Sequence, residues 1–114
     1  MKRSKHEIAL ERALAMYGHD LPPYLPECPV IPGRLWRWDF AWPTQQVLVE
    51  VQGGTFARGR SAHTGASLQT DFEKNNAAVV AGWSVLYFTA RDMTARTLPA
   101  TVDIIRQAIR RHEP

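Results

Sequence analysis

The spacing of hydrophobic residues divides the chain into helical and extended stretches. Apolar side chains recur at helical spacing over residues 4–17, where Ser4 and Glu7 can form a capping box and Gly18 ends the pattern, so we expect a first helix there. The same spacing predicts two further helices, over about residues 66–81 and about residues 98–112.

The stretches between the later helices have the composition of strands. Aromatic residues alternate with other side chains over residues 35–42, and residues 47–52 and 83–89 are short apolar runs rich in β-branched and aromatic side chains. Residues 43–46, which begin with a proline, predict the turn between the first two strands. The expected order is α-β-β-α-β-α, an α/β fold in which helices flank a mixed β-sheet.

Residues 19–34 follow a different rule, because five of these sixteen positions are proline. Proline lacks the backbone N–H that an interior helix or a central strand needs, so this segment can form neither. Its leucine, tyrosine, valine and isoleucine side chains are too apolar for a free linker. We therefore expect an ordered, extended connection.

Length and composition limit the class of protein. With 114 residues, 45% of them hydrophobic, the chain is expected to form one domain over residues 1–114. Cys28 is the only cysteine, which excludes an intrachain disulfide. Glu7 and Glu11 interrupt the N-terminal apolar stretch, and no stretch is long enough to span a bilayer, so we expect a cytoplasmic protein without a membrane partner. The net charge of +3 is compatible with a polyanionic partner.

The predicted hairpin brings two acidic residues together. If residues 43–46 form a four-residue loop, Trp42 pairs with Val47, and counting outward places Asp39 directly opposite Glu50 on the same face. Their Cβ atoms would then be about 5 Å apart, where two like charges destabilise a sheet. A hard divalent cation would relieve this repulsion, since Mg²⁺ is commonly held by one or two carboxylates. Gln52 follows on the same face and could orient a water or a metal-bound ligand.

Ordinary ion pairs are the alternative explanation of the same two acids. Asp39 would then pair with Arg34, Arg37 or Lys74, and Glu50 with an arginine. The spacing alone does not decide between a metal site and such ion pairs.

Four segments in order resemble small nucleases of phages, prophages and bacteria. These are PD-(D/E)XK enzymes similar to the very-short-patch-repair endonucleases. Their pattern is W-R-x-D-F-A-W-P, then E-V-x-G-G, then D-x-E-K-x-N on a helix, then G-W-x-V-L-x-F-T. This chain carries matching residues at 36–43, 50–54, 71–76 and 82–89, and the likeness covers roughly residues 34–90.

The resemblance implies a restriction-endonuclease-like fold and a metal-dependent cut in DNA. It makes Asp39 and Glu50 the ligands of Mg²⁺ or Mn²⁺ and places Gln52 where the superfamily has lysine. Gln52 departs from that pattern, and also from the acid that this close group often has there. Lys74 on the second predicted helix is then the candidate to supply the missing positive charge, although it could equally pair with Asp71 on its own helix.

The resemblance also assigns roles outside the hairpin. Glu7 matches an acid on the first helix of such nucleases, where it can reach the metal or its water shell, although the capping box explains Glu7 as well. The glycine-rich loop after the second predicted strand carries Arg58 and Arg60, which suit phosphates, together with His63 and Thr64. His63 could contact the scissile phosphate or act in proton transfer, and a mobile, solvated loop histidine is the alternative. The family loop reads G-R-H-T, and this chain has two inserted residues before His63.

The function expected from these residues is a metal-dependent DNA endonuclease. A domain of this size has little surface for reading a long sequence, which favours recognition of a junction, flap, mismatch or nick in phage or bacterial DNA repair or recombination. Similar small nucleases often act as homodimers. Because of Gln52, the alternative is a catalytically degenerate nucleic-acid-binding module with the same fold.

Overall fold

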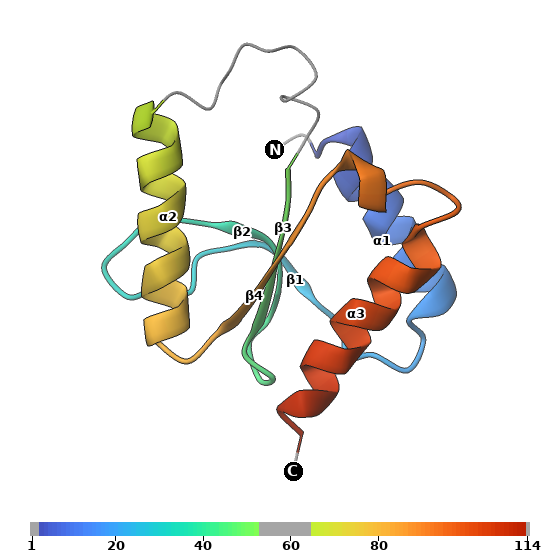
Figure 1. Cartoon of the computed structure of the whole chain (residues 1–114). Coiled ribbons are helices and arrows are strands. Elements are labelled where there is room, and N and C mark those ends of the chain that lie inside the picture. Colours follow the sequence, from blue (N-terminus) through green and yellow to red (C-terminus); the bar gives the residue numbers. More distant parts are fainter. Residues whose placement is uncertain (1–2, 53–64, 114) are drawn as a thin grey trace.

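The computed structural model describes residues 3–52 and 65–113, with the side chains of residues 65–68 left aside. Three helices surround a four-stranded sheet, with α1 and α3 on one face and α2 on the other (Figure 1). Their bounds, in chain order, are α1 Lys5–Tyr17, β1 Leu25–Cys28, β2 Trp38–Trp42, β3 Val47–Val51, α2 Gly65–Val80, β4 Ser84–Phe88, the 3-10 helix η2 Ala90–Asp92 and α3 Leu98–Arg111.

The sheet is mixed, in the spatial order β1-β2-β3-β4. β1 and β3 both run antiparallel to β2, whereas β3 and β4 run parallel to each other. Parallel neighbours need a long crossover, which here contains α2. The fold is therefore the expected mixed α/β arrangement with helices on both faces.

The predicted order of elements omitted one strand. Part of the proline-rich connection over residues 19–34 pairs with β2 as β1, so the order is α-β-β-β-α-β-α. β1 lies at the edge of the sheet, where a strand can tolerate Pro26 because one side of it needs no ladder partner. The expectation that the segment could not be a central strand is confirmed, whereas the expectation of a connection without a strand is wrong.

The other boundaries lie within one or two residues of the predictions, apart from the start of β2. The predicted strand over residues 35–42 begins only at Trp38, since β1 ends opposite Trp38 and offers no partner beyond it. Leu35, in the unpaired part, is 90% exposed. The differences of one or two residues at the helix ends are ordinary, because assigned helix ends commonly vary by that much.

Each face of the sheet has its own hydrophobic cluster. The larger one lies under α1 and α3 and includes Phe40, Trp42 and Ile105, all buried. The smaller one lies under α2 and contains Trp38 and Ala41, with Trp36 and Trp83 partly buried against it. Trp38 and Ala41 share a cluster although strict alternation would separate them, so the regular pleat is broken near Asp39.

An ion-pair cluster joins the end of α1 to α3. Arg106 donates to Asp20 at 2.8 Å and to the backbone carbonyl of Tyr17 at 2.6 Å, and Arg110 donates to Asp20 at 2.9 Å. These bonds hold the pKa of Asp20 at about 2.

Within the described residues, no helix is both long enough and apolar enough to cross a membrane.

Neighbouring isoleucines on α3 test how the core carries the fold. Ile105 is fully buried, so Ile105→Ala should lower the free energy of unfolding by about 2–5 kcal/mol through lost burial and the cavity it leaves. Ile104 is 44% exposed, and Ile104→Ala should change it by about 0.5 kcal/mol or less. Urea unfolding followed by circular dichroism measures both, and equal losses would contradict this assignment of the core.

Candidate functional site

The β2–β3 hairpin has the register that the sequence predicts. Residues 43–46 form the turn, and Trp42 pairs with Val47, Ala41 with Leu48 and Phe40 with Val49. The next step along both strands places Asp39 beside Glu50. Two acids therefore meet where the β2–β3 ladder ends, at the end of the sheet that also holds the last residues of β3 and β4.

Each acid bonds to the backbone of the other's strand. The Asp39 Oδ2 atom accepts the N–H of Val51 at 2.7 Å, and the Glu50 Oε1 atom accepts the N–H of Asp39 at 3.2 Å. The backbone ladder of this hairpin ends one step earlier, at Phe40 and Val49, so carboxylates take over the role of backbone carbonyls here. These bonds fix both carboxyl groups in place.

Lys74 supplies the positive charge at this position. Its Nζ lies 3.0 Å from Glu50 Oε2 and 4.7 Å from the centre of the Trp38 ring, and the residue is only 9% exposed. An amphipathic turn of α2 thus carries a lysine inward, with its stem against an aromatic ring and its charge on a carboxylate. In the part of the chain that the structure describes, Glu50 pairs with this lysine and not with an arginine. Asp39 has no ion pair with any lysine or arginine in the described ranges 3–52 and 65–113.

Glu7 serves two purposes at once. Its Oε1 atom accepts the N–H of Ser4 at 2.9 Å while the Ser4 hydroxyl accepts the N–H of Glu7 at 3.2 Å, which completes the expected capping box. The Oε2 atom is buried and, among described residues, has no hydrogen-bond donor. It belongs to the same group of carboxylates as Asp39. The capping box and a place in the acidic site are therefore compatible.

Glu27 is an acid of this site that its place in the sequence does not predict. β1 pairs Pro26 with Phe40 and Cys28 with Trp38, so Glu27 lies opposite Asp39 on the side away from Glu50. Its backbone is left-handed, with φ of 49°, which is uncommon for a residue other than glycine. Glu27 lay in the segment interpreted as a connection, and a lone glutamate among prolines carries no periodic signal that could have revealed its position.

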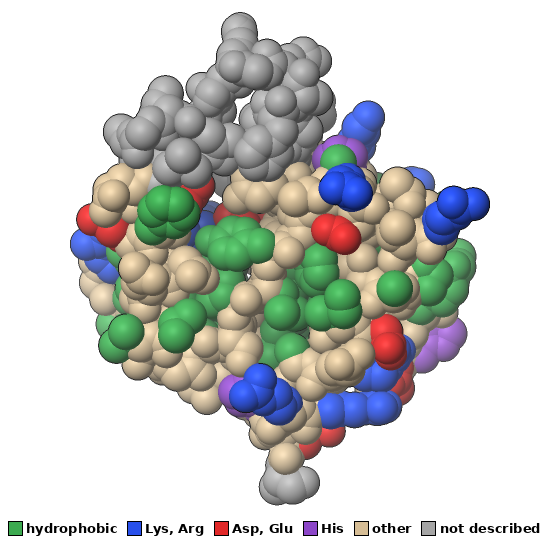
Figure 2. Space-filling model, in the orientation of Figure 1, with side chains coloured by type: hydrophobic (Ala, Val, Ile, Leu, Met, Phe, Trp, Pro, Cys, Tyr) green, Lys and Arg blue, Asp and Glu red, His purple; other side chains and the backbone are tan. Residues whose placement is uncertain are grey.

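Tyr87 completes a row of side chains across the sheet. β4 pairs it with Glu50, so the row runs from Glu27 through Asp39 and Glu50 to Tyr87. Burial and the Glu50 charge raise the pKa of Tyr87 to about 12. Figure 2 shows acidic side chains reaching the surface at this end of the molecule, between α2 and the α1 side.

The acids strongly affect one another's ionisation. Burial, followed by repulsion from Glu50, raises the pKa of Asp39 to about 8. Burial also raises the pKa of Glu50, although the Lys74 charge opposes this effect. The pKa of Glu7 is lowered, because hydrogen bonds to Ser4 and Asp39 outweigh the opposing effect of burial. At neutral pH without a cation, a proton is therefore held at Asp39, next to an ionised Glu7.

The donor set fits a hard divalent cation. One oxygen from each of Glu7, Glu27 and Asp39 lies within 4.8 Å of the others, and all are carboxylate oxygens, the ligands that Mg²⁺, Mn²⁺ and Ca²⁺ prefer. A cation would also give the buried Glu7 Oε2 atom a partner. Ordinary ion pairs account for Glu50 through Lys74 and reach Glu27 through Arg3 at 3.7 Å, but among the described residues none involves Glu7 or Asp39.

The remaining predicted site residues divide into two groups. Gln52 directly follows β3, and its backbone N–H donates to the carbonyl of Phe88 at 2.7 Å, which keeps Gln52 at this end of the sheet. Arg58, Arg60, His63 and Thr64 lie outside the described residues.

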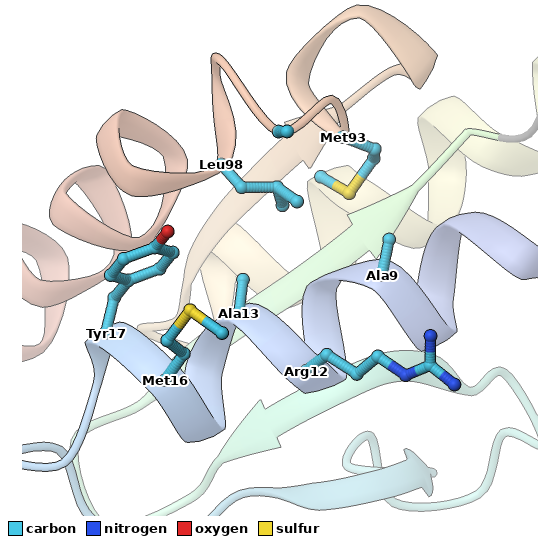
Figure 3. Close-up of a pocket in the computed structure, with 8 residues that line it drawn as sticks. Ala9, Arg12, Ala13, Met16, Tyr17, Met93 and Leu98 are labelled. Carbon is cyan, nitrogen blue, oxygen red and sulfur yellow. The ribbon is translucent and has the colours of Figure 1, made fainter.

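A separate hollow of about 350 Å³ lies between α1 and the segment that leads into α3 (Figure 3). Met16, Tyr17, Met93 and Leu98 point into it, and Arg12 is the one charged side chain among the residues that line it. It contains none of the acids described above, so it is not part of the candidate site.

Comparison of the chain with protein-family models, with curated proteins and with solved structures found no match. The chemistry of the site therefore has to be argued from its own residues.

The raised pKa of Asp39 predicts how stability depends on pH without metal. Folded Asp39 keeps its proton up to about pH 8, whereas an unfolded aspartate loses it near pH 3.9, so ionising the folded group costs stability. In EDTA, wild type should lose stability relative to Asp39→Asn as the pH rises from about 4 to about 8, and the difference should level off above about pH 8.

Urea unfolding at several pH values measures this difference, in which contributions from other titrating groups cancel. Asp103→Asn makes the same chemical change at an exposed position on α3 and should stay parallel to wild type. A gap between wild type and Asp39→Asn that does not change with pH would contradict the raised pKa.

Proposed function

We propose that this chain is a Mg²⁺- or Mn²⁺-dependent DNA endonuclease with a restriction-endonuclease-like, PD-(D/E)XK arrangement. The observation that carries the proposal is the pair Asp39 and Glu50, fixed side by side at the end of the hairpin with a buried lysine against Glu50. Phosphodiester hydrolysis needs this combination of oxygen ligands for a cation and a second positive charge.

Asp39 and Glu50 would hold the metal ion, and Glu7 would reach the ion or its water shell from α1. A bound Mg²⁺ or Mn²⁺ would lower the pKa of a bound water, and its positive charge would stabilise the negative charge of the scissile phosphate. The backbone N–H groups of Asp39 and Val51 hold the two hairpin carboxyl groups. The direction in which their remaining oxygen lone pairs point is therefore set by the backbone and not by flexible side chains. The Ser4 cap does the same for Glu7.

Lys74 takes the role that a lysine two residues after Glu50 has in the superfamily name. Gln52 cannot provide a charge there, whereas Lys74 reaches the same carboxylate from α2. From this position the ammonium group can stabilise negative charge on the attacking water or on the phosphate. Lys74, with Gln52 or His63, would position the water, and Arg58, Arg60 and Thr64 would hold the DNA backbone.

The substrate we propose is DNA with a local structure, such as a junction, flap, mismatch or nick, in phage or bacterial repair or recombination inside the cytoplasm. The small size of the domain supports this, because few side chains are available to read base edges. Two copies acting as a homodimer would cut both strands. Gln52 favours a second candidate, a DNA-binding module of the same fold that has lost catalysis.

Removing the central acid separates these two functions. Asp39→Asn should lower the cleavage rate at least about 10³-fold, because the metal loses its shared ligand, while DNA affinity should change by less than about threefold. The assay uses labelled junction, flap, mismatched, nicked and linear DNA with Mg²⁺, Mn²⁺ or EDTA, and measures affinity by fluorescence anisotropy in Ca²⁺. Asp103→Asn is the matched control and should cleave like wild type.

The outcomes are distinct. Metal-dependent cleavage by wild type that is lost in Asp39→Asn supports the endonuclease. Binding to DNA without cleavage of any of these substrates supports the binding module instead. Faster cleavage of a matched RNA hairpin than of the DNA hairpin would contradict the assignment of DNA as substrate.

Lys74 has a separate test. Lys74→Met should lower the cleavage rate by about 10²-fold or more, since it removes a preorganised charge from the site. Lys5→Met makes the same change of net charge at an exposed position on α1 and should have little effect. Thermal unfolding with and without Mn²⁺ shows whether each variant is folded under assay conditions. A folded Lys74→Met that cleaves within about twofold of wild type would exclude this role.

A further inference from the structure

Three carboxylates from three different elements converge beside the hairpin. Glu7 comes from α1, Glu27 from β1 and Asp39 from β2, and one oxygen of each lies within 4.8 Å of the other two. Glu50 is not part of this group, because its two oxygens face the Asp39 N–H and Lys74. The group therefore lies on the opposite side of Asp39 from Lys74.

The buried oxygen of Glu7 is a candidate contact for a bound ion. Glu7 is 8% exposed, and within the described part of the chain its Oε2 atom has no hydrogen-bond donor beyond the proton that Asp39 holds when no cation is bound. The Glu7 carboxyl group is one of the three that converge. Buried polar atoms are rarely left without a partner, and a partner for a carboxylate oxygen must be positive or a donor.

Arg3 provides only part of the missing charge. Its guanidinium lies 3.7 Å from Glu27 and 3.6 Å from Glu11, outside hydrogen-bond distance of both, and packs 4.8 Å from the centre of the Phe40 ring. None of its nitrogens has a hydrogen-bond acceptor among described residues. One arginine shared with Glu11 therefore compensates at most one of these three carboxyl groups.

The size of the group matches a divalent cation. Oxygens bound on opposite sides of one ion are about 4.2 Å apart for Mg²⁺ and about 4.8 Å apart for Ca²⁺, and adjacent ligands are closer. Oxygens within 4.8 Å of one another can thus contact one ion with only small side-chain movement. A hydrogen-bond donor such as water would satisfy one oxygen but would not offset the charge.

We propose that Glu7, Glu27 and Asp39 form a divalent-cation site that does not use Glu50, with Glu27 as its distinguishing ligand. The site shares Asp39 with the proposed nuclease centre. Any role of this ion in cleavage rests on the proposed function, whereas binding of the ion does not. Glu27 is then the residue that sets the position of this ion along β1.

Calorimetric titration of the full chain with Mn²⁺, without nucleic acid, tests the site. Wild type should bind Mn²⁺, and Glu27→Gln and Glu27→Asn should each weaken binding by about tenfold or more. The asparagine variant is included because asparagine tolerates the left-handed backbone at this position. Glu11→Gln, which removes the other carboxylate near Arg3, should bind within about twofold of wild type.

A second variant separates this site from the nuclease centre. E50Q combined with K74M removes the Glu50–Lys74 pair without leaving either charge unpaired, and it should keep the Mn²⁺ binding that depends on Glu27 even where binding at the proposed nuclease centre is lost. The rise in unfolding temperature from EDTA to Mn²⁺, compared within each variant, provides a second measurement that does not depend on changes in metal-free stability.

The proposal is overturned if wild type binds no Mn²⁺, if both Glu27 variants bind as tightly as wild type, or if the double variant loses the binding that depends on Glu27. Wild type that binds Mn²⁺ through Glu27 but cleaves no DNA would support this site and count only against the proposed endonuclease.

Discussion

Repulsion between the carboxylates around Asp39 is the constraint on which the rest of the site depends. Asp39 lies between Glu50 on one neighbouring strand and Glu27 on the other, with Glu7 above, and a partly buried position weakens screening by water. Each compensating group comes from a different part of the chain: two backbone N–H groups from the hairpin, Lys74 from α2 and the Ser4 cap from α1. Displacing any one of these elements would leave a charge uncompensated.

The topology of the sheet explains why these elements meet. Because β3 and β4 are parallel, the chain must cross over one face of the sheet between them, and the crossover helix α2 brings Lys74 to Glu50. α1 packs on the other face and brings Glu7 to the same end, while β1 adds Glu27 at the edge. A hairpin alone would place two acids together, but only the layered fold surrounds them from both faces (Figure 1).

How far the sequence predicted this site depended on how local each feature is. The meeting of Asp39 and Glu50 follows from alternation and a four-residue turn, both local, and the register confirmed it. Pairing of Lys74 with Glu50 depends on how α2 is rotated against the sheet, which its spacing from Asp71 does not encode. Glu27 was missed because β1 is held by long-range pairing, while its prolines suppress every local sign of a strand.

The fold does not need acids at positions 39 and 50. Trp38, Phe40 and Leu48 beside them are fully buried, and apolar residues of similar size at these two positions would remove both the desolvation cost and the repulsion. Only at this point of the hairpin do charged side chains take partly buried positions in the sheet. The Ser4 cap, Lys74 and the backbone N–H groups reduce the cost of desolvation and repulsion without removing it. Stability alone therefore gives no reason for the cluster, whereas a bound cation would turn the same repulsion into affinity.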